Sequence, residues 1–147
     1  MIFLKLLALT LTAIILVPSG AHLFELPGKI DLDREAYFIV QGIYNGWAFF
    51  AIPIFAAILA NAALFVAQRH QNFKSALWAL TSSVLIMISL AVFFTCIFPA
   101  NEATVNWTIK PENWETLRKN WEYGHAANAV IVFFAFIASA LAAIRRE

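Results

Sequence analysis

Two short motifs place a histidine and a glutamate one helical turn apart. The first is His22-x-x-Glu25, which follows a long apolar stretch, and the second is Glu122-x-x-His125, which precedes another. Residues at i and i+3 lie on one face of a helix, so each motif presents an imidazole beside a carboxylate. An imidazole can take up or release a proton near neutral pH, and a carboxylate can orient it or act as a base itself. These four side chains are therefore candidates for proton-transfer chemistry.

The second motif belongs to a longer stripe of ionisable residues. Glu115 and Arg118 precede Glu122 and His125 so that the four follow the spacing i, i+3, i+7, i+10 on one helical face. The predicted helix continues into Ala126–Ile144, which contains no charged residue. The stripe would thus end at the edge of an apolar span. The predicted catalytic residues are His22, Glu25, Arg118, Glu122 and His125.

The composition indicates an integral membrane protein. Of the 147 residues, 62% are hydrophobic and only 13% are charged, whereas a soluble domain has about 45–50% apolar and about 25% charged residues. The net charge of +1 gives no indication of a nucleic-acid partner. The single cysteine, Cys96, excludes an internal disulfide, and its apolar neighbours predict a buried thiol.

Hydropathy and turn signals predict four membrane-spanning helices in one domain. A secretory signal peptide also fits the first apolar stretch, but we favour a retained helix because its polar pair has counterparts in the fourth span. Short inner turns and two longer polar loops predict an all-α, up-down-up-down transmembrane four-helix bundle with an outer polar and aromatic cap. The predicted spans are about 2–23, 34–68, 75–98 and 112–145.

The charges of the loops give the expected orientation. Five Lys and Arg residues lie on each side, but those on the side of the termini are more compact and accompany a single acidic residue. This distribution weakly favours cytoplasmic N- and C-termini, in a cell inner or plasma membrane. The expected partners are the lipid bilayer and a lipophilic small molecule. Assembly into a homo-oligomer or into a larger membrane complex is compatible with the sequence.

The first and fourth helices of such a bundle are neighbours, so the two motifs could converge at its outer edge. Histidine and carboxylate ligands suit a divalent transition metal, so His22, Glu25, Glu122 and His125 form a candidate metal site. The two histidines could instead be the axial ligands of a haem. A structural alternative is that ion pairs, such as Glu122 with Arg118 or Glu25 with His125, lock the helices together.

Aromatic residues gather near the same edge. Tryptophan and tyrosine are common at membrane interfaces for amphipathic reasons alone, so an aromatic belt is one interpretation. The other is an aromatic-walled pocket for a flat, lipophilic substrate. For that pocket, the predicted substrate-binding residues are Tyr44, Trp47, Asn101, Trp107 and Trp121.

Four segments resemble the anthrone oxygenase-like family of small four-helix membrane proteins, many of which are known only as a domain of unknown function. They are GAHLFELPGKI (Gly20–Ile30), QGIYNGW (Gln41–Trp47), FPANEATVNWT (Phe98–Thr108) and W-x-x-L-R-x-x-W-E-x-x-H (Trp114–His125). The resemblance covers nearly the whole chain. It implies a four-helix membrane bundle and, for some members, oxygenation of a polycyclic anthrone to a quinone without an added cofactor.

If that chemistry applies, His125 or His22 would remove the acidic methylene proton of the anthrone. Arg118 and Asn101 could stabilise the developing enolate oxygen, and the tryptophans would stack on the rings. The leading hypothesis is therefore a membrane oxidoreductase of the monooxygenase type. The alternatives are a metal- or haem-binding redox protein and a non-enzymatic accessory subunit of a membrane complex. A bound metal or chromophore would favour the former alternative, and stability only beside a partner would favour the latter.

Overall fold

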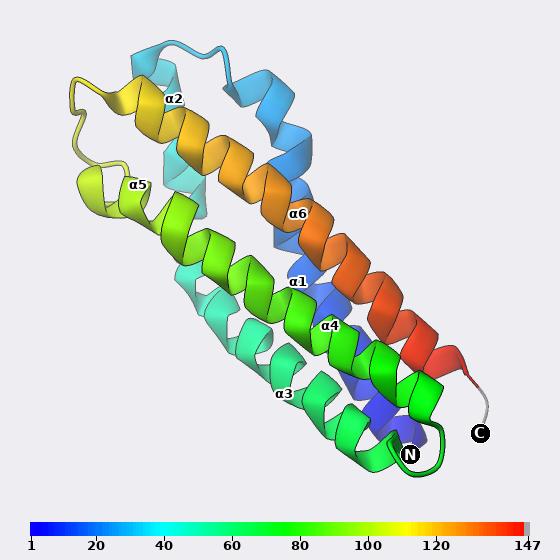
Figure 1. Cartoon of the computed structure of the whole chain (residues 1–147). Coiled ribbons are helices and arrows are strands. Elements are labelled where there is room, and N and C mark those ends of the chain that lie inside the picture. The colour runs from blue at the N-terminus through cyan, green and yellow to red at the C-terminus, as the bar shows by residue number, and fades with distance from the viewer. Residues whose placement is uncertain (146–147) are drawn as a thin grey trace.

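The computed structural model describes residues 1–145, and every regular element in that range is helical (Figure 1). Four stretches are long and apolar enough to cross a membrane, which indicates an integral membrane protein and confirms the predicted all-α bundle. The elements are α1 (Ile2–Lys29), α2 (Arg34–Gln41), the 3₁₀ turns η1 (Gly42–Tyr44) and η2 (Trp47–Phe50), α3 (Ala51–Gln68), α4 (Phe73–Val92), the π-helical segment η3 (Phe93–Ile97), α5 (Phe98–Ala103) and α6 (Trp114–Ile144).

The long helices form a ring in which α1 and α4 each pack against both α3 and α6. Buried alanines along their contact faces, including Ala8, Ala57, Ala79 and Ala135, let the backbones approach closely. Large apolar side chains such as Phe55 and Phe134 instead point outward, as expected for flanks that contact lipid. The predicted proximity of the first and fourth spans is therefore observed.

The N-terminus and the C-terminal end of α6 lie at one end of the bundle, together with the turn between α3 and α4 (Figure 1). The ammonium of Lys5 there donates to the carbonyl of Arg145 at 3.0 Å. We call this the inner end. The α1–α2 and α5–α6 connections lie at the opposite, outer end, where α2 and the 3₁₀ turns extend the bundle beyond α3.

The second predicted span is not one continuous helix. The prediction of 34–68 as a single helix was wrong, because the chain breaks at Gly46, which has the left-handed backbone angle φ 87°. Gly46 takes this conformation without a Cβ clash, and Asn45-Gly46 is a common turn signal that the apolar surroundings obscured. The break lets the 3₁₀ turns carry Tyr44 and Trp47 toward α1 and α6.

Other helix ends differ by a few residues. Helix α1 continues through Pro18 and Pro27 to Lys29, since membrane helices tolerate proline in their interior. Asp33 caps α2 by accepting from the amide of Ala36 at 2.9 Å. The third span continues past the predicted end at 98 to Ala103, with Pro99 in the first turn of α5. Helix α6 begins at Trp114 rather than at 112.

The π-helical segment η3 packs closely against α6. A Cβ atom at Gly124 would lie 2.7 Å from Cγ1 of Ile97 and 3.4 Å from Cβ of Cys96, so only glycine allows this approach. The extra residue in the π turn also leaves the side chain of Cys96 exposed on the surface of the bundle. The prediction of a buried thiol was therefore wrong.

Candidate functional site

The two histidines meet at the outer edge of the membrane span. His22 lies about 30 Å along α1 from its inner end, and His125 lies about 29 Å along α6 from its inner end, at 1.5 Å per residue. These lengths match the hydrocarbon thickness of about 30 Å. The imidazole rings stack with centroids 3.8 Å apart and an interplanar angle of 27°. We call them the histidine pair.

Aromatic rings surround the histidine pair. Trp121 contacts both rings, with centroid distances of 5.0 Å to His22 and 4.2 Å to His125. Tyr44 and Trp47 contact His22 at 4.6 Å and 5.2 Å. His22 is buried and His125 is half-buried. Aromatic rings therefore line at least one side of the histidine pair.

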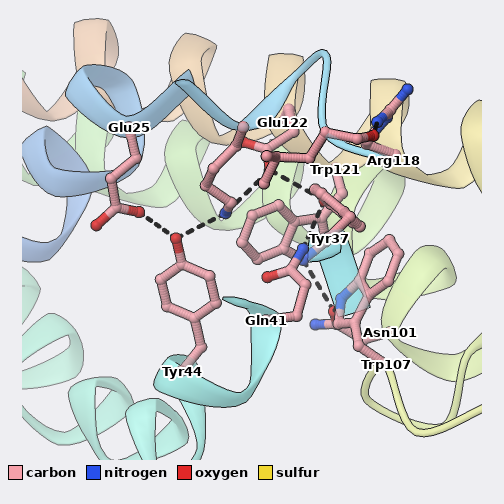
Figure 2. A network of polar contacts seen from close by, with 11 residues as sticks. Glu25, Tyr37, Gln41, Tyr44, Asn101, Trp107, Arg118, Trp121 and Glu122 are labelled. Carbon is pink, nitrogen blue, oxygen red and sulfur yellow. Dashed lines mark hydrogen bonds and ion pairs between the residues drawn. The ribbon is translucent and has the colours of Figure 1, made fainter. Parts of the chain in front are cut away.

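A chain of buried polar contacts is shown in Figure 2, and two of its residues, Tyr44 and Trp121, contact His22. The amide of Gln41 donates to the hydroxyl of Tyr37 at 2.5 Å, and this hydroxyl donates to Oε1 of Glu122 at 2.9 Å. The ammonium of Lys29 contacts the same oxygen at 3.0 Å. Lys29 and Glu122 are 5% and 0% exposed, so this is a buried ion pair within the apolar bundle.

Tyr44 joins a second carboxylate to the same ammonium. Lys29 donates to the hydroxyl of Tyr44 at 2.7 Å, and Tyr44 donates to Oε2 of Glu25. Figure 2 shows Glu25, Tyr44 and Glu122 joined through one amine. Three aromatic rings also flank the ammonium, with the centroids of Tyr44 at 4.4 Å and Trp121 at 4.6 Å the nearest. We call Glu25, Lys29, Tyr37, Gln41, Tyr44 and Glu122 the polar centre.

The two tyrosines of the polar centre stay protonated at neutral pH. Burial raises the pKa of Tyr37, and the neighbouring Glu122 carboxylate raises it further. Burial likewise raises the pKa of Tyr44, and so does its hydrogen bond to Glu25. Both phenols therefore act as neutral hydrogen-bond donors that tie α2 and η1 to the helices below.

Asn101 holds two tryptophan side chains in place through hydrogen bonds. Its side-chain oxygen accepts from the indole N–H of Trp121 at 2.9 Å and from that of Trp107 at 3.2 Å (Figure 2). Val105, Asn106 and Trp107 all have positive φ angles of 48–65°, a conformation that costs about 1–2 kcal/mol per non-glycine residue. This strained turn brings Trp107 against Tyr37, at a centroid distance of 5.2 Å. Asn101 is therefore a positioning residue for the aromatic wall.

Arg118 lies at the edge of the polar centre. Its guanidinium donates to the carbonyl of Leu32 at 2.6 Å and stacks on Trp114 at 4.6 Å. The predicted Glu122–Arg118 ion pair does not form among the described residues, because Glu122 pairs with Lys29 instead. Glu115, the first residue of the stripe, is exposed.

The candidate metal site does not form. Among residues 1–145, no group of three or more His, Cys, Asp and Glu side chains is arranged to hold a metal ion. His22 and His125 stack on each other, while Glu25 and Glu122 bind Tyr44, Lys29 and Tyr37 instead of facing the imidazoles. A haem with axial histidines also does not fit, because stacked rings 3.8 Å apart leave no space for a porphyrin between them.

Several buried atoms of the site have no hydrogen-bond partner within residues 1–145. They are Nδ1 of His22, Oε1 of Gln41, Nε of Arg118 and Oε2 of Glu122. An unsatisfied buried polar atom costs about 1–3 kcal/mol, so such atoms are rare unless water or a ligand meets them. These four atoms belong to the histidine pair, the polar centre and the adjoining Arg118, which together form the candidate functional site.

Three residues of the polar centre are not among the site residues predicted from the sequence. They are Lys29, which is expected to lie in a loop, Tyr37 and Gln41. The available signal was the helical spacing of Lys29 from Glu25 and His22, at i+4 and i+7, which places all three on one face of α1. Tyr37, Gln41 and Tyr44 likewise follow i, i+4, i+7.

Comparison with known proteins adds no assignment. No family model matches the chain, and neither the curated proteins nor the solved structures contain a significant match.

Proposed function

We propose that this protein is an integral membrane oxidoreductase of the oxygenase type that acts on a lipophilic aromatic compound at the outer membrane interface. The observation that carries the proposal is the buried site itself, in which a histidine pair, a lysine and two carboxylates lie among aromatic rings. Within the described residues, polar atoms of His22, Gln41 and Glu122 in this site have no hydrogen-bond partner. A flat apolar molecule could reach this depth from the outer leaflet, where it would concentrate.

The geometry supports proton abstraction at the histidine pair. An imidazole of His22 or His125 would accept a proton from an acidic C–H of the bound aromatic compound. Lys29 supplies positive charge near the enolate oxygen that develops, in the role that the sequence analysis gave to Arg118. Asn101 supports this step indirectly, since its oxygen is occupied by two indoles.

The oxidation that follows can be balanced without a further cofactor. The carbanion transfers its electrons to dioxygen, and a carbon–oxygen bond forms at the former methylene carbon. Loss of water then leaves a ketone, so one methylene and one dioxygen yield one carbonyl and one water. The resemblance to anthrone oxygenases suggests an anthrone as the model substrate.

We also propose that both termini lie in the cytoplasm, which places the candidate functional site at the opposite face of the membrane.

A second candidate is a non-enzymatic bundle that serves as an accessory subunit. Its support is that Lys29, Glu122 and Tyr37 bond mainly to one another, as expected for a structural lock between helices. In that case the polar centre would determine the packing of α1, α2 and α6 and would have no substrate.

Oxygen consumption separates the two candidates. The protein in lipid nanodiscs is supplied with an anthrone, and dioxygen uptake and quinone formation are recorded. We expect His125→Ala to lower the rate about a hundredfold or more, since general-base catalysis contributes about 10²–10⁴. His70→Ala is the matched control, because His70 is an exposed residue in the turn at the inner end. Full turnover by both His125→Ala and His22→Ala would remove the histidine pair from the mechanism.

A further inference from the structure

Polar side chains continue through the interior of the bundle, far below the candidate functional site. Asn61, Ser82 and Ser139 are each 0% exposed, and Gln68 is 1% exposed. Each carries an unpartnered atom, which is Oδ1 of Asn61, Oγ of Ser82 and Ser139, and Nε2 of Gln68. A buried polar atom without a partner is costly, so such atoms are rare unless a water molecule meets them.

These groups lie at successive depths between the two ends. Asn128 lies about 4.5 Å below the histidine pair along α6, and Ser139 lies about 21 Å below it, at 1.5 Å per residue. Asn61 donates to the hydroxyl of Thr12 at 3.0 Å, and Thr12 lies about 15 Å below His22 along α1. Ser75 closes the series at the inner end by donating to Gln68 at 2.9 Å, with Ala142 as a second acceptor at 2.7 Å.

Two apolar layers separate the polar levels. Ile15, Ile86 and Val132 belong to the layer between Asn128 and the Asn61–Thr12 pair. Leu64 and small alanines belong to the layer nearer the inner end. The longest gap is about 10 Å along the helices, which about three water molecules in a row would bridge at hydrogen-bond spacing.

We propose that this line of buried polar groups conducts protons through the bundle between its inner end and the histidine pair. Water molecules bound to the unpartnered atoms would complete the line, because buried waters occur where polar atoms lack partners. Protons would pass from water to water along these hydrogen bonds, with no net chemical change to any side chain. The apolar layer around Ile86 would limit the rate, since a layer without polar groups holds water poorly.

The inference is independent of the proposed oxygenase activity, and its test contains no aromatic substrate. The full chain is reconstituted in phosphatidylcholine vesicles that contain the pH dye pyranine, and a potassium gradient with valinomycin drives proton entry. We expect entry to be faster than in protein-free vesicles. Asn61→Leu and Ser139→Ala should each lower the protein-dependent rate about tenfold, the change expected when one hydrogen bond to a conducting water is lost.

Two further variants make the result specific. Thr81→Val removes an exposed hydroxyl that bonds only the carbonyl of Leu77 on its own helix, so it should conduct like the wild type. Ile86→Ser, which adds a hydroxyl to the limiting layer, should raise the rate. Circular dichroism and size-exclusion profiles select variants that remain folded, and Ser139→Ala is the mildest of them. Wild-type vesicles that are no faster than protein-free vesicles, or unchanged rates in Asn61→Leu and Ser139→Ala, would overturn the proposal.

Discussion

The two ends of the bundle bury polar groups in different ways. At the outer end, Lys29 and Glu122 form a charged pair that is shielded from solvent and extended by tyrosines. At the inner end, Ser75 joins Gln68 to the carbonyl of Ala142 through neutral hydrogen bonds. A neutral bond contributes about 1 kcal/mol, whereas loss of one partner from a buried ion pair costs about 3–5 kcal/mol. The outer end should therefore be far more sensitive to single substitutions.

The largest effect is expected for Glu122→Leu, which leaves the ammonium of Lys29 buried without its ion-pair partner. We expect the free energy of unfolding to fall by about 3–5 kcal/mol, measured by denaturant titration in detergent micelles. Ser75→Ala at the inner end is the comparison and should cost about 1 kcal/mol.

A double substitution sharpens this test. Lys29→Met combined with Glu122→Leu removes both charges, so most of the lost stability should return. Equal losses for Glu122→Leu and Ser75→Ala would show that the buried charges do not set the difference between the two ends.

The next effect concerns the joint between α6 and the π-helical segment η3, just below the polar centre. Gly124→Ala would place its Cβ 2.7 Å from Ile97, and overpacking of this kind costs about 1–3 kcal/mol. Gly28→Ala is the matched control, because nothing lies within 4 Å of the added Cβ. It should be neutral or stabilising, since alanine favours helix by up to about 1 kcal/mol. The same titration measures both variants, and equal stability would refute the close approach.

Alkaline pH should weaken the outer end selectively. The pKa of Tyr44 is raised in the folded protein. The stabilisation that its protonated hydroxyl gives the folded state is therefore complete below the unfolded pKa of about 10 and is lost as the pH rises above that value. At pH 11 this amounts to at most about 1.4 kcal/mol for one tyrosine, and to less to the extent that solvent screens the partly exposed hydroxyl. Tyr44→Phe should therefore show a smaller loss of stability between pH 9 and pH 11 than the wild type. Tyr123→Phe, at an exposed position, is the control.

The smallest effect is expected at the surface of the outer end. Lys110 bonds the exposed Glu35 and lowers the pKa of its carboxyl group. The resulting stabilisation is present above the unfolded pKa of glutamate, about 4.3. It is lost as the pH falls through the lower pKa that Glu35 has in the folded protein. Lys110→Gln should move the pKa of Glu35 back upward in an NMR titration, with little change in stability because exposed ion pairs are weak. An unchanged pKa would contradict the contact.

Parts of the site followed from local spacing. The i, i+3 motifs placed His22 with Glu25 and Glu122 with His125, and the bundle topology then predicted that α1 and α6 are neighbours. Stacking of the histidines could not be predicted, because it depends on the rotation of each helix about its axis. The same rotation directs Glu122 to Lys29, so Arg118 instead donates a hydrogen bond to the carbonyl of Leu32. The metal hypothesis failed for this reason.

By itself, the sequence determined the class of protein. Long apolar stretches must become helices in a bilayer, since no other open structure satisfies their backbone hydrogen bonds, and this requirement does not depend on tertiary detail. Only the tertiary structure decided which polar groups meet. The break at Gly46 brings Tyr44 to Lys29, and the strained turn at Val105–Trp107 brings Trp107 to Asn101. The first contact joins residues 15 positions apart. The second joins residues only six positions apart, but it depends on three consecutive left-handed residues. Local periodicity contains no information about either.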